Sequence, residues 1–144
     1  MKVESERSGL VLGLVSYLTF DEAKNLLHLG DQKIVVLEES KSPKQDGIPP
    51  FNIYTIKVPD IDVEGFNGAL MLFFFNNRLM EVRFYPIDID GFALSVDGLS
   101  NSKSINIEPY TRAWLDKDYQ GNSYIGWVDV RLQKQFYAWI KNYS

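Results

Sequence analysis

The chain has no cysteine and only one histidine in its 144 residues. Without cysteine, the chain as given cannot form disulfides, thiolate metal sites, a cysteine nucleophile or a lipid-modified cysteine. Histidine is the side chain whose ordinary pKa lies closest to neutrality, so His28 is the obvious candidate for a general base. A general base also needs a group that orients it, and the sequence around His28 supplies none. We therefore interpret His28 as a surface residue and predict no catalytic residue.

Basic charge is also scarce. Lysine and arginine number 15 against 19 aspartates and glutamates, which gives a net charge of -4 and a pI of about 5.0. Nucleic-acid binding needs clustered lysine and arginine to neutralise phosphates, so this function is disfavoured. An acidic surface instead attracts a basic protein partner.

Long apolar runs are missing as well. The best candidate, GLVLGLVSYLTF at residues 9–20, is shorter than the roughly 20 residues that a membrane-spanning helix needs. Glu4 and Glu6 precede it, and no cleavage site of the small-residue type follows, so it does not resemble a signal peptide. We predict no membrane span and a cytoplasmic location; a leader trimmed upstream would place the protein in the periplasm instead.

Motifs for common chemistries are absent: the sequence has no G-x-S-x-G, no G-x-x-x-x-G-K and no G-x-G-x-x-G. Two aspartate-rich stretches, residues 60–65 and 116–121, place acidic side chains at alternate positions before a glycine, as calcium loops do. A calcium loop also needs a glutamate at its twelfth position, where these stretches have Met71 and Trp127. We expect turns whose aspartates bond their own backbone, and predict no metal and no cofactor.

The residues that are present predict one α+β domain over residues 1–144. In the stretch GALMLFFFNNRLMEVRFYP, two apolar β-rich runs flank Asn76 and Asn77. Two asparagines in this position predict a tight hairpin turn in which both residues have positive φ. An antiparallel sheet centred on this hairpin, residues 68–85, is therefore expected.

Pairing outward from the turn predicts which hairpin residues share a face. It sets Phe73 opposite Met80 and Met71 opposite Val82, so this face is expected to be core. The opposite face is half apolar and half charged, and is either covered at its apolar end or forms a surface patch. Its residues are Leu70, Leu72, Phe74, Leu79, Glu81 and Arg83, with Tyr85 beyond.

Two helices are expected to pack against the apolar face of this sheet. The first spans residues 20–29; Thr19 and Glu22 have the spacing of a capping box, and Gly30 is expected to adopt the left-handed conformation after it. The second is the amphipathic C-terminal segment that begins at Val128, whose apolar residues recur every three or four positions. Further strands are predicted at residues 33–39, at 52–58, where Pro59 should end the strand, and within 103–128.

Two segments of the chain are similar to small bacterial envelope proteins of the SmpA/BamE type. These are the helical opening LGLVSYLTFDEAKNLLHLG and the strand-turn-strand ALMLFFFNNRLMEVRFYP. The resemblance implies a helical pair against a three-stranded antiparallel sheet and an accessory, protein-binding role in envelope assembly. Proteins of that type carry a lipid on a cysteine, which this chain does not have.

Size, acidity and the half-apolar hairpin face favour a non-catalytic protein-binding module, such as an inhibitor or an immunity protein that neutralises a toxin. Tyr119 lies in a polar turn and is expected to be exposed. The candidate binding residues are Leu72, Phe74, Glu81, Arg83, Tyr85 and Tyr119. The alternatives are the envelope accessory and a hydrolase that uses the acidic residues of 60–65 or 116–121.

Overall fold

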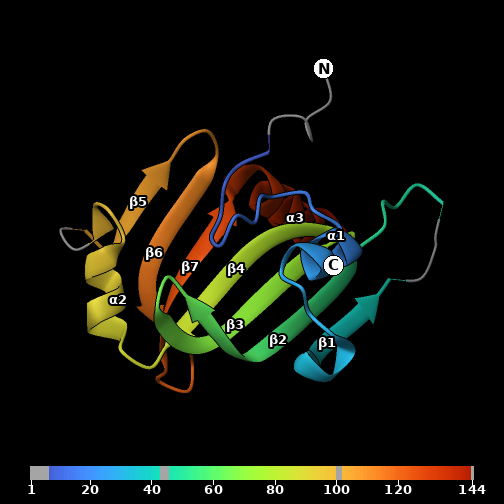
Figure 1. Ribbon diagram of the computed structural model, residues 1–144. Coiled ribbons are helices and arrows are strands. Elements are labelled where there is room, and N and C mark those ends of the chain that lie inside the picture. The colour runs from blue at the N-terminus through green and yellow to red at the C-terminus, as the bar shows by residue number, and fades with distance from the viewer. Residues whose placement is uncertain (1–6, 43–45, 100–101, 144) are drawn as a thin grey trace.

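The computed structural model describes residues 7–42, 46–99 and 102–143. The strands are β1 (Val35–Lys41), β2 (Asn52–Val63), β3 (Phe66–Phe75), β4 (Arg78–Pro86), β5 (Ser104–Ile107), β6 (Thr111–Lys117) and β7 (Ser123–Asp129). The helices are α1 (Phe20–Leu26), α2 (Ile89–Ser95) and α3 (Val130–Tyr143), with a short 3-10 helix at Asp31–Lys33. All seven strands form one antiparallel sheet in the order β1-β2-β3-β4-β7-β6-β5 (Figure 1). The predicted α+β class and the central hairpin are confirmed.

The front face of the sheet, towards the viewer in Figure 1, carries the larger hydrophobic core. Residues 10–29, including α1, cross this face, and α2 adds Phe92, which packs against Phe84 and Trp127. The buried strand residues of this core are Ile56, Val58, Val63, Leu70, Leu72, Phe74, Leu79, Val82, Phe84, Ala113, Ile125 and Trp127.

The opposite face, called the rear face below, carries a smaller core under α3. Leu132 of α3 joins Phe75, Met80 and Val128 there. Figure 1 shows α3 behind the strands and α1 in front of them. We expected both helices on one face. They lie on opposite faces because Phe74 and Phe75, consecutive residues of β3, point to opposite faces near the hairpin tip. Phe20 of α1 covers Phe74, and Phe136 of α3 covers Phe75.

The tip of the hairpin is built as predicted. Asn76 and Asn77 have φ values of 51° and 56°, so both adopt the left-handed conformation of a tight turn. Phe75 pairs with Arg78 and Phe74 with Leu79, but the next pair is Phe73 with Glu81. Met80 is thus an extra residue in β4, which makes a β-bulge.

This bulge shifts the register of the rest of the hairpin by one residue. A one-residue shift moves every following side chain to the other face of a strand relative to its partner. Leu72 now lies opposite Val82 and Leu70 opposite Phe84. All four are fully buried in the front core. The apolar residues of both strands therefore share one face, which uninterrupted pairing would not allow.

The predicted surface position of Leu72 and Phe74 is consequently wrong. Leu72 is 0% exposed and Phe74 is 1% exposed, so neither side chain can reach a partner in this fold. Phe73 and Met71, expected in the core, lie half-buried on the rear face with Glu81 and Arg83. The physical reason is the extra residue Met80, which the sequence pattern alone does not mark.

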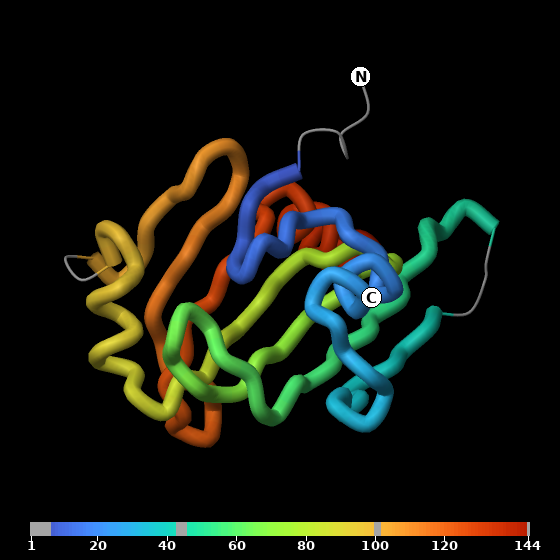
Figure 2. The backbone as a smooth tube through the Cα atoms, viewed as in Figure 1, coloured from blue at the N-terminus to red at the C-terminus, as the bar shows by residue number. Residues whose placement is uncertain are grey.

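The bulge coincides with a change of neighbour beside β4. From Glu81 onward β4 pairs with β7, but Leu79 bonds to the N-terminal segment instead. The Tyr17 amide donates to the Leu79 carbonyl at 3.0 Å, and the Leu79 amide donates to the Leu18 carbonyl at 2.7 Å. Figure 2 shows the N-terminal segment, in blue, running across the strands towards the hairpin tip.

Two boundaries differ from the prediction for local reasons. β2 continues past Pro59 to Val63, because a register shift between Val58 and Ile61 leaves the proline outside the ladder, where a missing N–H is harmless. The capping box of α1 is present as predicted. The left-handed residue after it, however, is His28 with φ of 55°, whereas Gly30 has φ of -83°.

The two neighbouring phenylalanines give a direct test of the register. Phe74→Ala should lower the free energy of unfolding by ~3–5 kcal/mol, because it leaves a cavity in the front core. Phe73→Ala should cost clearly less, because Phe73 is only half-buried. Urea denaturation of both variants measures the difference, and a larger loss for Phe73→Ala would contradict the bulged register.

Candidate functional site

The rear face beyond α3 carries an arginine held between aromatic rings. The Arg83 guanidinium lies 4.9 Å from the centroid of the Phe73 ring and 4.7 Å from that of Tyr124. The Tyr85 ring lies 5.3 Å from the Tyr124 ring. A guanidinium is attracted to aromatic faces, so these rings hold Arg83 in one orientation.

Arg83 also forms an ion pair with Glu81 along β4. Arg83 Nε donates to Glu81 Oε2 at 2.6 Å, and the Glu81 side chain is 9% exposed. Burial raises the pKa of the Glu81 carboxyl, and Arg83 offsets this only in part. Burial lowers the pKa of Arg83, but the Glu81 carboxylate outweighs it, so the pKa of Arg83 is raised. The Arg83 charge is therefore largely balanced within the chain.

A glycine extends this aromatic cluster onto β6. Trp114 lies opposite Gly126, and a Cβ atom on Gly126 would come within 2.6 Å of the indole ring. The indole Nε1 donates to the Tyr124 hydroxyl at 3.2 Å. A side chain at position 126 would thus displace the indole from β7, and the indole in turn bonds Tyr124 beside Arg83.

Next to the cluster the rear face is hollowed, with an open volume of about 710 Å³. The hollow runs from β1 across the sheet to the β6–β7 turn, and below it is called the rear hollow. Its principal side chains are Leu37, Lys57, Met71, Arg83, Tyr85 and Tyr119. Three of these, Arg83, Tyr85 and Tyr119, are residues that the sequence predicted for a binding site.

The β6–β7 turn closes one end of the rear hollow. Asp118 accepts hydrogen bonds from the backbone amides of Gln120 and Asn122, both at 2.9 Å. These bonds hold the pKa of Asp118 below its ordinary value. The prediction that this stretch is a turn made by aspartate–backbone bonds is confirmed. The turn projects Tyr119, which is 95% exposed, as expected for a polar turn.

The loops and strand ends at the β6–β7 turn end of the sheet are strongly acidic. Antiparallel pairing brings the β2–β3, β4–α2 and β6–β7 connections to the same end, because β3, β4 and β7 are consecutive neighbours. We call these connections together with the adjoining ends of the strands and of α2, residues 60–65, 86–90 and 116–122, the acidic end. They carry one cation, Lys117. Their acidic residues are Asp60, Asp62, Glu64, Asp88, Asp90, Asp116 and Asp118.

Sequence reasoning found part of this surface and missed part. Arg83 and Tyr85 line the rear hollow, and Tyr119 reaches it from the turn. The predicted binding residue Glu81 lies on the same face but is buried in its ion pair with Arg83 and does not line the hollow. Leu72 and Phe74 do not line it either, since both are core residues. The missed residues are Leu37, Lys57, Met71, Phe73, Trp114 and Tyr124. They come from five strands, so no local sequence pattern links them.

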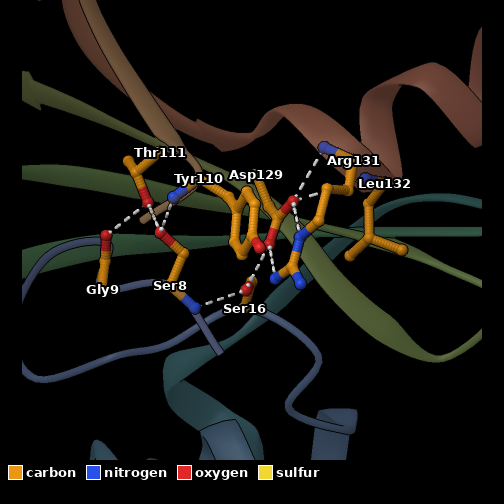
Figure 3. Close-up of polar contacts among 8 residues, drawn as sticks. All are labelled: Ser8, Gly9, Ser16, Tyr110, Thr111, Asp129, Arg131 and Leu132. Carbon is orange, nitrogen blue, oxygen red and sulfur yellow. Dashed lines mark hydrogen bonds and ion pairs between the residues drawn. The ribbon is translucent and has the colours of Figure 1, made fainter. Parts of the chain in front are cut away.

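A second polar cluster surrounds Asp129 at the end of β7, and its Ser8, Ser16, Thr111 and Asp129 are buried (Figure 3). Ser16 Oγ donates to Asp129 Oδ2 at 2.6 Å, and Arg131 Nη2 donates to the same oxygen at 2.7 Å. Ser8 bonds the Thr111 hydroxyl, and its amide donates to Ser16 Oγ at 3.0 Å. The buried hydroxyls and carboxylate thus satisfy one another.

This cluster joins three distant parts of the chain: the N-terminal segment, the start of β6 at Thr111, and the junction of β7 with α3. Asp129 ends β7, accepts the Arg131 amide at 2.8 Å at the start of α3, and holds Ser16 of the N-terminal segment. A serine beside an aspartate resembles part of a hydrolytic triad, but such a triad also needs a base. The single histidine, His28, is exposed on another part of the chain, after α1. The geometry is that of a structural anchor.

The prediction of an aspartate–backbone turn is wrong for residues 60–65, because residues 60–63 belong to β2 and their aspartates bond a side chain of β3. Asn67 Nδ2 donates to Asp60 Oδ1 at 2.7 Å and to Asp62 Oδ1 at 3.2 Å. Within residues 7–42, 46–99 and 102–143, no group of three or more acidic or histidine side chains is arranged to hold a metal ion.

Comparison of the chain with models of protein families, with curated proteins and with solved structures finds no match. The resemblance to SmpA/BamE-type envelope proteins therefore stays a prediction. In the part of the chain that the structure describes, no helix has the length and apolarity needed to cross a bilayer.

The Asp129 anchor predicts a pH-dependent stability. Burial raises the pKa of Asp129, but hydrogen bonds from Arg131 and Ser16 outweigh it, so the pKa is lowered in the folded protein. A lowered carboxyl pKa contributes stability above the unfolded pKa of about 4, and this contribution is lost as the pH falls through the folded value. Asp129→Asn should therefore cost roughly 2–3 kcal/mol at pH near 7 and less below pH about 4.

Urea denaturation of the wild type and Asp129→Asn across this pH range measures the effect. Asp21→Asn, at an exposed position in the first turn of α1, serves as the control. It should cost little at any pH. A cost for Asp129→Asn that stays constant from neutral to acidic pH would contradict the anchor.

Proposed function

We propose that this chain is a protein-binding module that docks a basic partner protein in the rear hollow and inhibits it, as an immunity protein neutralises a toxin. Its proposed location is the cytoplasm. The observation that carries the proposal is the rear hollow itself, an open surface beside an ordered aromatic–arginine cluster.

The composition of the rear hollow supports protein binding. Aromatic residues, methionine and arginine are enriched in protein interfaces, and tyrosine and arginine are frequent among the residues that contribute most to affinity. Tyr85, Arg83 and Met71 line the hollow, and Tyr119 stands exposed at its rim. Because Arg83 is held by Glu81 and by two rings, its side chain loses little further freedom on binding.

The acidic end supports a basic partner. The acidic end carries seven carboxylates and one lysine, and its Asp118 lines the hollow itself. Such a concentration of one sign of charge accelerates the approach of an oppositely charged protein and orients it towards the hollow. The rim then provides steering, while the aromatic interior provides most of the affinity.

Two carboxylates, that of Asp118 in the rear hollow and that of Glu81 beside it, support binding rather than hydrolysis. Glu81 is paired with Arg83, and Asp118 is committed to the backbone amides of its turn. A pair of carboxylates that divides acid and base roles needs two groups free to exchange protons with a substrate.

Site-specific crosslinking tests this function. A photoreactive phenylalanine analogue at position 119 should capture one basic protein in cells of the native host, whereas the same analogue at position 137 should not. Tyr137 is a matched control because it is a tyrosine, 59% exposed, on α3 away from the hollow. Capture from position 137 alone, or capture of an acidic protein from position 119, would contradict the proposal.

The captured partner then allows a functional test. Expressed alone it should arrest growth, and co-expression of the wild-type chain should restore growth. Tyr119→Ala should weaken binding at least tenfold, because tyrosines are frequent among the residues that contribute most to interface affinity. Its free energy of unfolding should be unchanged, because the side chain is exposed. Calorimetric titration measures the binding affinity, and urea denaturation measures the free energy of unfolding. If the partner has no activity that the chain inhibits, the immunity function is wrong, whereas the protein-binding function stands.

A further inference from the structure

β1 is an open edge of the sheet. It pairs only with β2 among the described strands, and all seven of its residues are exposed. An edge strand presents unpaired backbone N–H and C=O groups along its outer side, which can accept a further strand.

The start of β1 is unusually apolar for an exposed edge. Val35, Val36 and Leu37 are 47%, 50% and 48% exposed. They form the one run of consecutive exposed aliphatic residues in the described parts of the chain. Proteins usually protect an edge with charge, proline or a bulge. Here the bulge between Val36 and Glu38 turns Leu37 towards the rear hollow but does not cover the strand.

The second half of β1 adds negative charge. Glu38 and Glu39 follow the aliphatic run directly and point to opposite faces, because Glu38 lies opposite Thr55 and Glu39 opposite Tyr54. A strand added to this edge would therefore meet a carboxylate on each face. Opposite charges across a strand pair stabilise it, and like charges destabilise it.

A second copy of this chain is a poor occupant of the edge. Every antiparallel register that pairs most of one β1 with another β1 sets a glutamate opposite a glutamate or an aliphatic side chain. Registers that set Lys41 opposite a glutamate leave much of Val35, Val36 and Leu37 unpaired.

We propose that the β1 edge binds an extended segment of another protein as an additional antiparallel strand. The segment carries basic residues opposite Glu38 and Glu39 and aliphatic residues opposite Val35 and Val36. This inference stands on the edge strand and needs no contact with Tyr119. Leu37 nevertheless lines the rear hollow, so a partner seated there can reach the edge without leaving the surface.

The probe for this inference is an end-capped peptide of sequence Thr-Thr-Lys-Lys-Val-Ile-Val. In the antiparallel register its lysines lie opposite Glu39 and Glu38. Two control peptides carry glutamate in place of both lysines, or N-methyl groups on alternate residues, which remove the hydrogen bonds to the edge. Amide chemical shifts and amide hydrogen exchange of the full chain report binding residue by residue.

The lysine peptide should shift and protect amides of β1, slowing their exchange by about tenfold or more. The glutamate and N-methylated peptides should do neither. The double variant Glu38→Lys with Glu39→Lys should reverse the preference and bind the glutamate peptide. Both positions are exposed, so the variant should fold normally, which circular dichroism checks.

Three results would overturn the inference. They are equal binding of the lysine and glutamate peptides, shifts confined to residues outside β1, and a dimer with protected β1 amides in the absence of peptide. The same titration on Tyr119→Ala separates the two proposals, since this variant should lose the partner and keep the peptide. Loss of peptide binding with partner capture intact would therefore count against the edge alone.

Discussion

The extra residue Met80 in β4 is the constraint on which the two faces of this sheet depend. With it, Leu70, Leu72 and Phe74 lie opposite Phe84, Val82 and Leu79, respectively, on the front face. Without it, the same strands would divide their apolar residues between both faces, and neither face would make a continuous core. The bulge is held from outside the hairpin, by backbone bonds between Leu79 and residues 17 and 18.

The polarity of the rear face follows from the same register. Once the aliphatic residues are in front, Glu81, Arg83 and Tyr85 must lie behind, beside Phe73 and the residues that β6 and β7 contribute. α3 covers the part of this face near the hairpin tip, where Phe75 and Met80 need burial. It leaves the remainder open, which is where the rear hollow forms.

The predictable parts of the structure are those encoded by neighbouring residues. Asn76 and Asn77 predict the hairpin turn, and Thr19 and Glu22 predict the start of α1. Apolar periodicity predicts the C-terminal helix. The bulge was not predictable, because its stabilising contacts come from a segment some sixty residues earlier in the chain. Glu81, Arg83 and Tyr85 could be grouped from the sequence because they alternate along one strand, β4. Their neighbours come from other strands and could not be predicted from a local pattern.

Charge divides the molecule along the strands. α3 contains Arg131, Lys134 and Lys141 and no acidic residue, and it lies towards the hairpin tip. The acidic end lies at the other end of the same strands. The proposed basic partner is therefore expected to be repelled at one end of the rear face and attracted at the other. Asp118 and Tyr119 of the acidic end line the hollow, so in the proposed function charge and aromatic contacts favour the same part of the surface. That agreement between two independent features distinguishes the rear hollow from the other exposed apolar side chains of this protein.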